Sequence, residues 1–150
     1  MAQLGKFESQ LELKSPAEKV FDIFRRKSYL FPKIVPQMVK DVKLVSGDWE
    51  SVGSVRLWNY VAGDCESGKE TVEAFADDPK SITFTYLDGA AMDLYKSLKV
   101  GFQFSSEGEH CMTKKVLAYE KRNANVPDAD KYLEFTCGML PSVDAYLLKA

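Results

Sequence analysis

The sequence has 150 residues, of which 45% are hydrophobic and 28% are charged, an ordinary composition for a globular domain. It contains 20 lysine and arginine residues against 22 aspartate and glutamate residues, so the formal net charge is -2. Proteins that bind nucleic acid draw most of their affinity from neutralising phosphates, and a slightly acidic chain with scattered lysines is a poor candidate. We therefore expect one domain over residues 1–150 that binds no nucleic acid.

The N-terminal residues and the cysteines both indicate a cytoplasmic protein. Charged residues appear within the first eight positions, before any apolar run, which is not the pattern of a secretory signal. No stretch approaches the length of a membrane span. Cys65, Cys111 and Cys137 are far apart in the sequence and contain no CxxC pair. An odd, scattered set of this kind is typical of free thiols in a reducing compartment.

The N-terminal third of the chain predicts one strand followed by two short helices. Residues 4–13 carry apolar side chains among polar neighbours and are predicted to form the strand. A helix is predicted to begin at Ser15-Pro16-Ala17-Glu18, where the serine caps the first turn and Glu18 completes a capping box. Residues 28–38, which contain two prolines, predict a second short helix or turn.

The middle of the chain, residues 40–121, alternates apolar and polar side chains with the period of a strand. Short turn signals rich in glycine and aspartate separate the apolar runs, which predicts an antiparallel meander. The predicted strands are Val42–Ser46, Ser54–Ala62, Lys69–Phe75, Ser81–Leu87, Ser97–Phe104 and Met112–Lys121. Gly68, just before the third of them, is expected to mark a bulge.

A long amphipathic helix is predicted from about Asp128 to Leu148, with a kink or break near residues 137–141, where Gly138 and Pro141 interrupt it. Its apolar stripe comprises Tyr132, Phe135, Met139, Leu140, Val143 and Leu147. The order strand, helix pair, six strands and long helix predicts an α+β fold in which one curved antiparallel sheet buries this stripe. One helix cannot fill such a sheet, so an internal cavity is expected.

Short motifs in the right order along essentially the whole chain resemble the major latex proteins, a branch of the birch-pollen-allergen superfamily that also includes pathogenesis-related proteins. The motifs are Gly5-Lys6 with Glu8, Lys14-Ser15, Phe21-Asp22-Ile23-Phe24, Pro32-Lys33, Gly47-Asp48-Trp49 with Gly53-Ser54-Val55, Trp58-Asn59-Tyr60, Tyr95-Lys96-Ser97, Tyr119-Glu120-Lys121 with Asn123, and Val126-Pro127-Asp128 with Lys131-Tyr132-Leu133. The resemblance implies a helix-grip fold, as in START-type lipid-binding domains, with seven strands around the C-terminal helix and two short supporting helices.

The resemblance also implies a large internal cavity for a lipid, sterol, terpenoid, alkaloid or phenolic, in a protein linked to plant defence or specialised metabolism. Some relatives are enzymes that cyclise or isomerise reactive intermediates without a cofactor. A carrier and a cofactor-free cyclase or isomerase therefore both remain open for this chain, because fold does not decide function.

Inward-facing apolar and aromatic positions are the candidates for the ligand-binding wall, although the same alternation is typical of plain core. The predicted lining residues are Phe24, Trp58, Tyr60, Ile82, Phe84, Tyr86, Leu98, Val100, Phe102, Leu117, Tyr132, Phe135, Met139 and Val143.

Three residues are the candidates for catalysis if the protein is an enzyme: Lys115, Tyr119 and Arg56. Relatives commonly carry a bulky aromatic residue where this chain has Lys115. If that side chain faces inward, burial lowers the pKa of its amine and makes it a possible base or imine former. The alternative is a solvent-facing lysine beside Lys114.

Other chemistry is poorly supported by the sequence. His110 is the single histidine and falls in a predicted turn, and the cysteines have no ligand spacing, so no metal site is predicted. The loop Gly47–Gly53 lacks the Lys-Ser/Thr ending of a phosphate loop and joins two predicted strands rather than a strand and a helix. We predict no cofactor. Nuclease activity is also poorly supported, because the sequence offers neither a basic groove nor a credible acid–base pair.

Overall fold

The computed structural model describes residues 3–149, and its main feature is a seven-stranded antiparallel sheet with the order β1-β7-β6-β5-β4-β3-β2. The strands are β1 (Gln3–Leu13), β2 (Val39–Ser46), β3 (Val55–Ala62), β4 (Asp64–Asp77), β5 (Lys80–Gly89), β6 (Tyr95–Glu107) and β7 (His110–Lys121). The helices are α1 (Ala17–Arg26), α2 (Phe31–Ile34) and α3 (Asp130–Lys149), with the short 3-10 helices η1 (Ser28–Leu30) and η2 (Ala90–Asp93).

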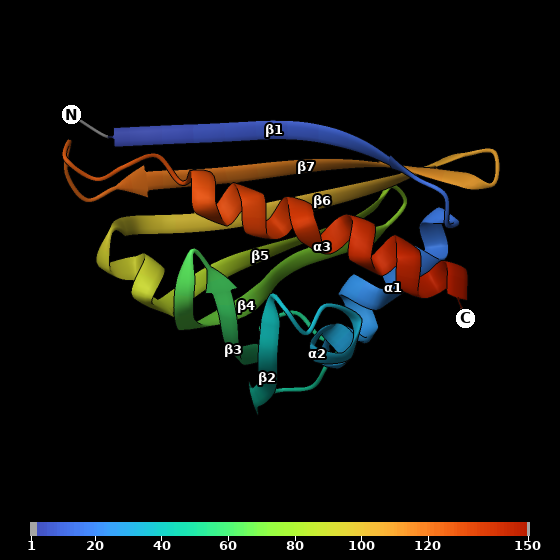
Figure 1. Cartoon of the computed structure of the whole chain (residues 1–150), viewed down its shortest axis with the longest axis horizontal. Helices are drawn as coiled ribbons and strands as arrows, with labels where there is room; N and C mark the ends of the chain where they lie inside the picture. The colour runs from blue at the N-terminus through green and yellow to red at the C-terminus, as the bar shows by residue number, and fades with distance from the viewer. Residues whose placement is uncertain (1–2, 150) are drawn as a thin grey trace.

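The predicted meander is confirmed, because β2 to β7 pair consecutively and β1 closes onto β7. The sharp turns at Gly63 and Gly108 have φ values of 80° and 64°, which glycine adopts without the steric penalty of a side chain. In Figure 1, β2 and β3 run in a clearly different direction from β1 and β7, so the sheet is strongly twisted and curved.

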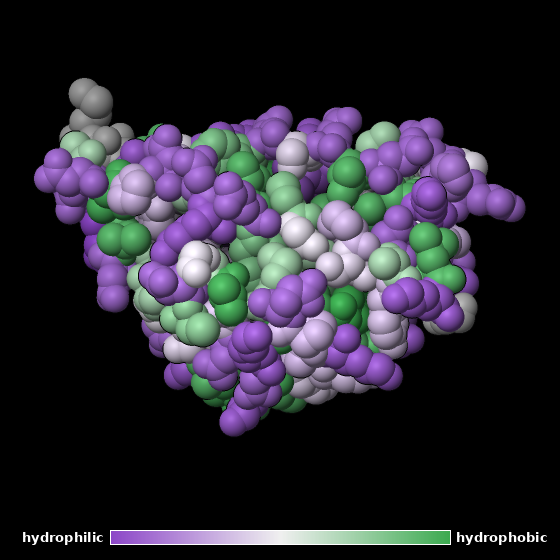
Figure 2. Space-filling model, viewed as in Figure 1, coloured by the Kyte–Doolittle hydropathy of each residue, from purple (hydrophilic) through white to green (hydrophobic). Residues whose placement is uncertain are grey.

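Helix α3 lies across one face of this sheet and buries most of its predicted stripe, including Phe135, Met139 and Val143, while Leu147 is half-buried. Helices α1 and α2 lie near its C-terminal end and contact it (Figure 1). Inner-face side chains of the strands complete the core, as in β3, where alternate residues are buried. The α+β fold predicted from the element order and the helix-grip arrangement implied by the resemblance are therefore the observed ones. Figure 2 shows the α3 side of the molecule, where hydrophilic side chains surround smaller hydrophobic groups.

The predicted capping box at α1 is wrong. Pro16 occupies the cap position, and no side chain caps the first turn. The Ser15 hydroxyl instead donates to Asp144 Oδ1 of α3 over 2.7 Å, and the Ser15 backbone N–H donates to the same oxygen over 2.9 Å. A tertiary partner distant in sequence has replaced the local cap, and this contact joins the start of α1 to the C-terminal part of α3.

Of the kink or break predicted near residues 137–141, the break is wrong, because α3 is continuous from Asp130 to Lys149 with Pro141 inside it, and the kink stays a prediction. A proline inside a helix removes one backbone donor, and its ring crowds the carbonyl four residues earlier, so it costs free energy there. Burial of Leu140 and Val143 on either side of the proline opposes that cost. Gly68 stands next to an observed bulge, since the β4–β5 register shifts between Lys69 and Glu70.

Candidate functional site

A partly enclosed cavity lies between the inner face of the sheet and α3. It is lined by Phe24, Ser28, Phe31, Trp58, Tyr60, Gly68, Lys69, Glu70, Phe84, Tyr86, Val100, Phe102, Phe135, Thr136 and Met139. The volume of this cavity is only about 40 Å³. That volume holds a few water molecules, whereas cavities for drug-sized ligands measure roughly 300–1,000 Å³.

Aromatic rings account for the small volume, so the large cavity implied by the resemblance is narrow in this structure. The Phe24 and Phe102 rings lie 4.7 Å apart between centroids, and the Tyr60 and Phe135 rings lie 5.1 Å apart. Phe24 comes from α1, Tyr60 and Phe102 from the sheet, and Phe135 from α3. Because these rings belong to separate elements, their rotation changes the volume without breaking the sheet.

Most of the predicted lining residues are gathered around this cavity: Phe24, Trp58, Tyr60, Phe84, Tyr86, Val100, Phe102, Phe135 and Met139. The others are buried elsewhere in the core: Ile82, Leu98, Leu117, Tyr132 and Val143. Period-two alternation identifies the inner face of a strand but not which part of that face a helix covers directly. The lining residues that sequence reasoning missed are Ser28, Phe31, Gly68, Lys69, Glu70 and Thr136.

A buried pair of opposite charge adjoins the cavity through Glu70, which lines it, whereas Arg56 is not a lining residue. Arg56 of β3 is 0% exposed, and its Nη1 lies 3.4 Å from Glu70 Oε1 on β4. Burial lowers the pKa of Arg56 and raises the pKa of Glu70 to about 7, and the attraction between the two groups opposes both changes. Arg56 Nε and Nη2 are buried and have no hydrogen-bond partner among residues 3–149. The predicted inward orientation of Arg56 is thus observed, but its partner Glu70 was not foreseen.

A second polar cluster centres on Glu66, whose side chain is 8% exposed. The hydroxyls of Tyr60 and Tyr132 donate to Glu66 Oε1 over 3.1 and 2.8 Å, and Lys131 Nζ lies 2.6 Å from Oε2. Burial raises the pKa of both tyrosines, and the neighbouring carboxylate raises it further. Tyr132 therefore joins α3 to β4 rather than lining the cavity.

Lys115 is 1% exposed, so the solvent-facing alternative is wrong. Its amine does not line the cavity but points under α3, where Nζ donates to the Leu133 carbonyl over 3.3 Å and contacts Cys137 Sγ. Burial lowers the pKa of this amine.

Tyr119 likewise lies outside the cavity and is 5% exposed. Its ring packs against Phe7 of β1 and Tyr95 of β6, with centroid separations of 5.9 and 5.5 Å. Gly5 of β1 gives the ring the room it needs, since a Cβ at that position would lie 2.2 Å from Tyr119 Cζ. The structure thus separates the predicted catalytic residues Lys115, Tyr119 and Arg56 instead of bringing them together.

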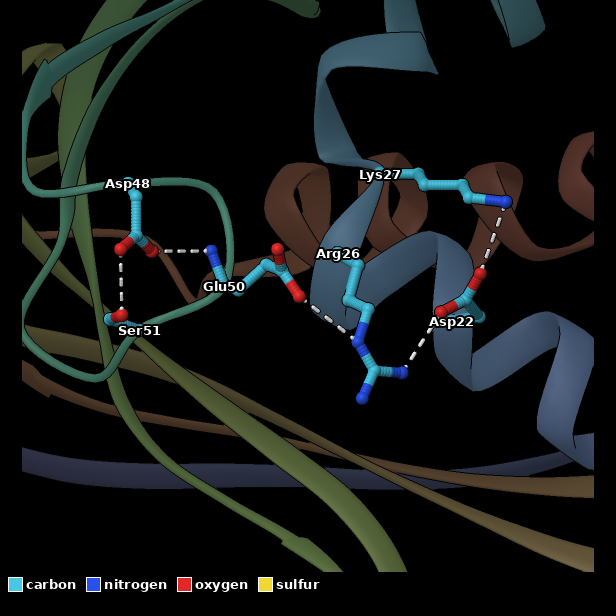
Figure 3. Close-up of polar contacts among 6 residues, drawn as sticks. All are labelled: Asp22, Arg26, Lys27, Asp48, Glu50 and Ser51. Atoms are coloured by element: carbon cyan, nitrogen blue, oxygen red, sulfur yellow. Dashed lines mark hydrogen bonds and ion pairs between the residues drawn. The ribbon is translucent and has the colours of Figure 1, made fainter.

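The loop Gly47–Gly53 is held by its own side chains and by α1 (Figure 3). Asp48 accepts hydrogen bonds from the Glu50 backbone N–H over 2.8 Å and from the Ser51 hydroxyl over 2.9 Å. Arg26 of α1 bridges Asp22 and Glu50, with both nitrogen-to-oxygen distances at 3.1 Å. These contacts give the loop a structural role in attaching α1 to the β2–β3 end of the sheet.

Residues 3–149 contain no group of three or more histidine, cysteine, aspartate or glutamate side chains placed to hold a metal ion. His110 is exposed at the start of β7, with Nδ1 3.7 Å from Glu12 Oε1. None of the helices described has both the length and the apolar character needed to cross a membrane.

The curved sheet, the long helix across it and the cavity between them define a helix-grip protein, and similar proteins give its family. The family model "Pathogenesis-related protein Bet v 1 family" matches residues 2–150. The chain is 31% identical over 152 residues to MLP-like protein 328 of Arabidopsis thaliana, covering 100% of both, and 32% identical to MLP-like protein 43 of the same plant, covering 97% of this chain and 94% of the relative. The chain therefore belongs to the Bet v 1 family, and it groups there with the MLP-like proteins.

Solved structures agree with this assignment. Ginseng major latex-like protein 151 from Panax ginseng superposes with a TM-score of 0.91 at 28% identity, covering 96% of this chain and 97% of its own. Norcoclaurine synthase from Thalictrum flavum superposes with a TM-score of 0.84 at 15% identity, covering 99% and 88%. At that identity the second likeness concerns the fold alone.

Proposed function

We propose that this chain binds a mostly apolar small molecule with one hydrogen-bonding group, in the cavity between the sheet and α3. The observation that carries the proposal is a partly enclosed, aromatic-walled cavity with the Glu70 carboxyl group in its wall and the buried Arg56 paired with that carboxyl group. The walls supply the burial that favours an apolar body, and a few placed polar groups fix its orientation. Lipids, sterols, terpenoids, alkaloids and phenolics all meet this description, and a role in plant defence or specialised metabolism in the cytoplasm stays a prediction.

The polar end of the ligand would meet Glu70 in the cavity wall and would reach Arg56 next to it. The Arg56 Nε and Nη2 groups lack partners among residues 3–149, and leaving buried donors unpaired costs free energy. An acceptor on the ligand, such as a hydroxyl, carbonyl or carboxylate oxygen, would remove that cost. Glu70, protonated below about pH 7, adds a donor beside it.

The cavity is too small for a drug-sized ligand and must widen as one enters. Because the cavity volume is only about 40 Å³, the rings of the wall must rotate as the ligand enters. Met139 lies on the wall with these rings, and its unbranched side chain adapts readily to a new shape. The cavity thus opens by side-chain rearrangement while the sheet stays intact.

Native mass spectrometry after incubation with a plant metabolite extract tests the proposal. Val100→Trp fills the cavity and is expected to abolish retention of the compound, whereas the matched control Val116→Trp is expected to retain it. Val116 is opposite Gly101, the neighbour of Val100, and lies outside the cavity. Equal retention by both folded variants, or none by the wild type, contradicts a cavity site.

The same measurement separates a carrier from an enzyme. An unchanged compound recovered in stoichiometric amount supports binding alone. Recovery of a cyclised or isomerised product that Val100→Trp no longer forms supports a cofactor-free enzyme working in the same cavity, because a shaped pocket supplies orientation without a metal or nucleotide. Turnover that disappears in Lys115→Met or Tyr119→Phe would restore the catalytic roles predicted for those residues.

A further inference from the structure

An amine and a thiol are in direct contact beneath α3, away from the cavity lining. Lys115 Nζ of β7 contacts Cys137 Sγ of α3, and its other partner is the Leu133 carbonyl at 3.3 Å. Ser9 is paired with Lys115 across the β1–β7 ladder, and its hydroxyl lies 4.0 Å from the same sulfur. Neither contact of the amine is with a carboxylate, so no salt bridge accounts for burying it here.

The environment suits both groups to react with each other. Burial lowers the pKa of the Lys115 amine, so a larger share of it is the neutral, nucleophilic form. Cys137 is only half-buried, which leaves its sulfur within reach of a small oxidant. The other two thiols differ, because Cys111 is fully buried beside Thr113 and Cys65 is exposed on β4.

We propose that peroxide converts this contact into a covalent sulfenamide bond between Cys137 Sγ and Lys115 Nζ. In the first step, the thiol attacks the peroxide O–O bond, which gives a sulfenic acid on Cys137 and one water. In the second, the neutral amine attacks the sulfenic sulfur, an S–N bond forms, and the hydroxyl leaves with a proton from nitrogen as a second water. The thiol is oxidised by two electrons and the peroxide is reduced. A thiol reductant reverses the link by attacking the sulfur and returning the hydrogens.

The link would fasten α3 to the sheet beside the cavity. Its two residues are 22 positions apart, and a crosslink over such a loop restricts the unfolded chain. Thr136 neighbours Cys137 and lines the cavity, so oxidation would also restrain the helical wall there. This second effect rests on the proposed function, whereas formation of the bond does not.

Peptide mapping of the full chain by mass spectrometry, with and without hydrogen peroxide, tests the proposal. The expected product joins the peptides of Lys115 and Cys137, has lost two hydrogens, resists trypsin at Lys115 and separates on treatment with a thiol reductant. A crosslinked product that has lost two hydrogens and gained one oxygen joins the same two atoms after a second peroxide is consumed, with the oxygen either between them or on the sulfur, and it supports the same pairing.

Two lysine variants and the identity of the oxidised products distinguish the Lys115–Cys137 crosslink from other oxidations of Cys137. Lys115→Met is expected to lose the crosslinked peptide and accumulate oxidised Cys137, while Lys114→Met, which changes the exposed neighbour, is expected to retain it. Disulfides between cysteines also remove two hydrogens, so mapping of Cys137 to Cys65 or Cys111 would overturn the proposal. So would oxidation of Cys137 to sulfinic acid without any link in the folded wild type. Failure of ligand binding would leave the crosslink result unaffected.

Discussion

Glu70 of β4 carries a buried carboxyl group, and two opposing effects act on its pKa. Its side chain is 12% exposed, so burial disfavours the carboxylate, while Arg56 Nη1 at 3.4 Å favours it. Burial is the larger effect and raises the pKa of Glu70 to about 7. The folded chain therefore binds the Glu70 proton more tightly than the unfolded chain, in which glutamate has a pKa of about 4.3.

The higher pKa of Glu70 in the folded state sets the sign of the pH dependence of stability. Proton binding favours the folded state, so the contribution is fully present below about pH 4 and is lost as pH rises through about 7. The difference in pKa corresponds to about 4 kcal/mol of unfolding free energy. In a chain of this length, that amounts to a fall in melting temperature of roughly 8–16 °C.

Urea unfolding of the wild type and of Glu70→Gln between pH 5 and pH 8 measures this contribution. Glutamine keeps the shape but cannot ionise, so other titrating groups cancel in the comparison, and the wild type is expected to lose stability relative to the variant as pH rises. Glu73→Gln changes an exposed residue of the same strand and is the matched control, with little relative change expected above pH 5. A wild type that gains stability relative to Glu70→Gln would refute the reasoning, because attraction to Arg56 would then outweigh burial.

Three further substitutions test the packing. Gly5→Ala places a Cβ 2.2 Å from the Tyr119 ring and is expected to lower the unfolding free energy by about 1–3 kcal/mol, measured by urea denaturation; an unchanged midpoint would mean that the ring moves freely. Asp144→Asn weakens the hydrogen bonds to Ser15 and is expected to cost about 1–2 kcal/mol, with faster amide exchange at the start of α1. Phe102→Ala is expected to lower the unfolding free energy by about 3–5 kcal/mol and to bind bulkier ligands. An unchanged preference for ligand size would show that the Phe102 ring does not limit the cavity volume.

The fold was largely predictable because its signals are local. Alternating side chains located the strands, and glycine-rich turns such as those at Gly63 and Gly108 joined consecutive strands, which leaves few topologies for a meander. Boundaries were less accurate: β4 begins at Asp64, not Lys69, because its first residues are polar and pair with β3 along the edge of the core.

The site was less predictable because its decisive contacts join residues that are distant in sequence. Glu70 and Glu66 resemble ordinary surface glutamates until β3 and α3 bring Arg56 and Tyr132 to them. Ser15 has every local feature of a helix cap, yet its partner is 129 positions away. Lys115 was recognisable as an unusual inward lysine, but only the packing of α3 shows that its neighbour is Cys137.

The arrangement of polar contacts along α3 determines which part of the cavity can change shape. Near its N-terminal end, Lys131 and Tyr132 are bound to Glu66, and near its C-terminal end Asp144 is bound to Ser15. Between these attachments, Phe135 and Met139 meet the cavity through nonpolar contacts, which have no required direction and are exchanged at low cost. A ligand can therefore displace rings along the middle of the helix without detaching its ends, and so without the larger cost of breaking buried hydrogen bonds.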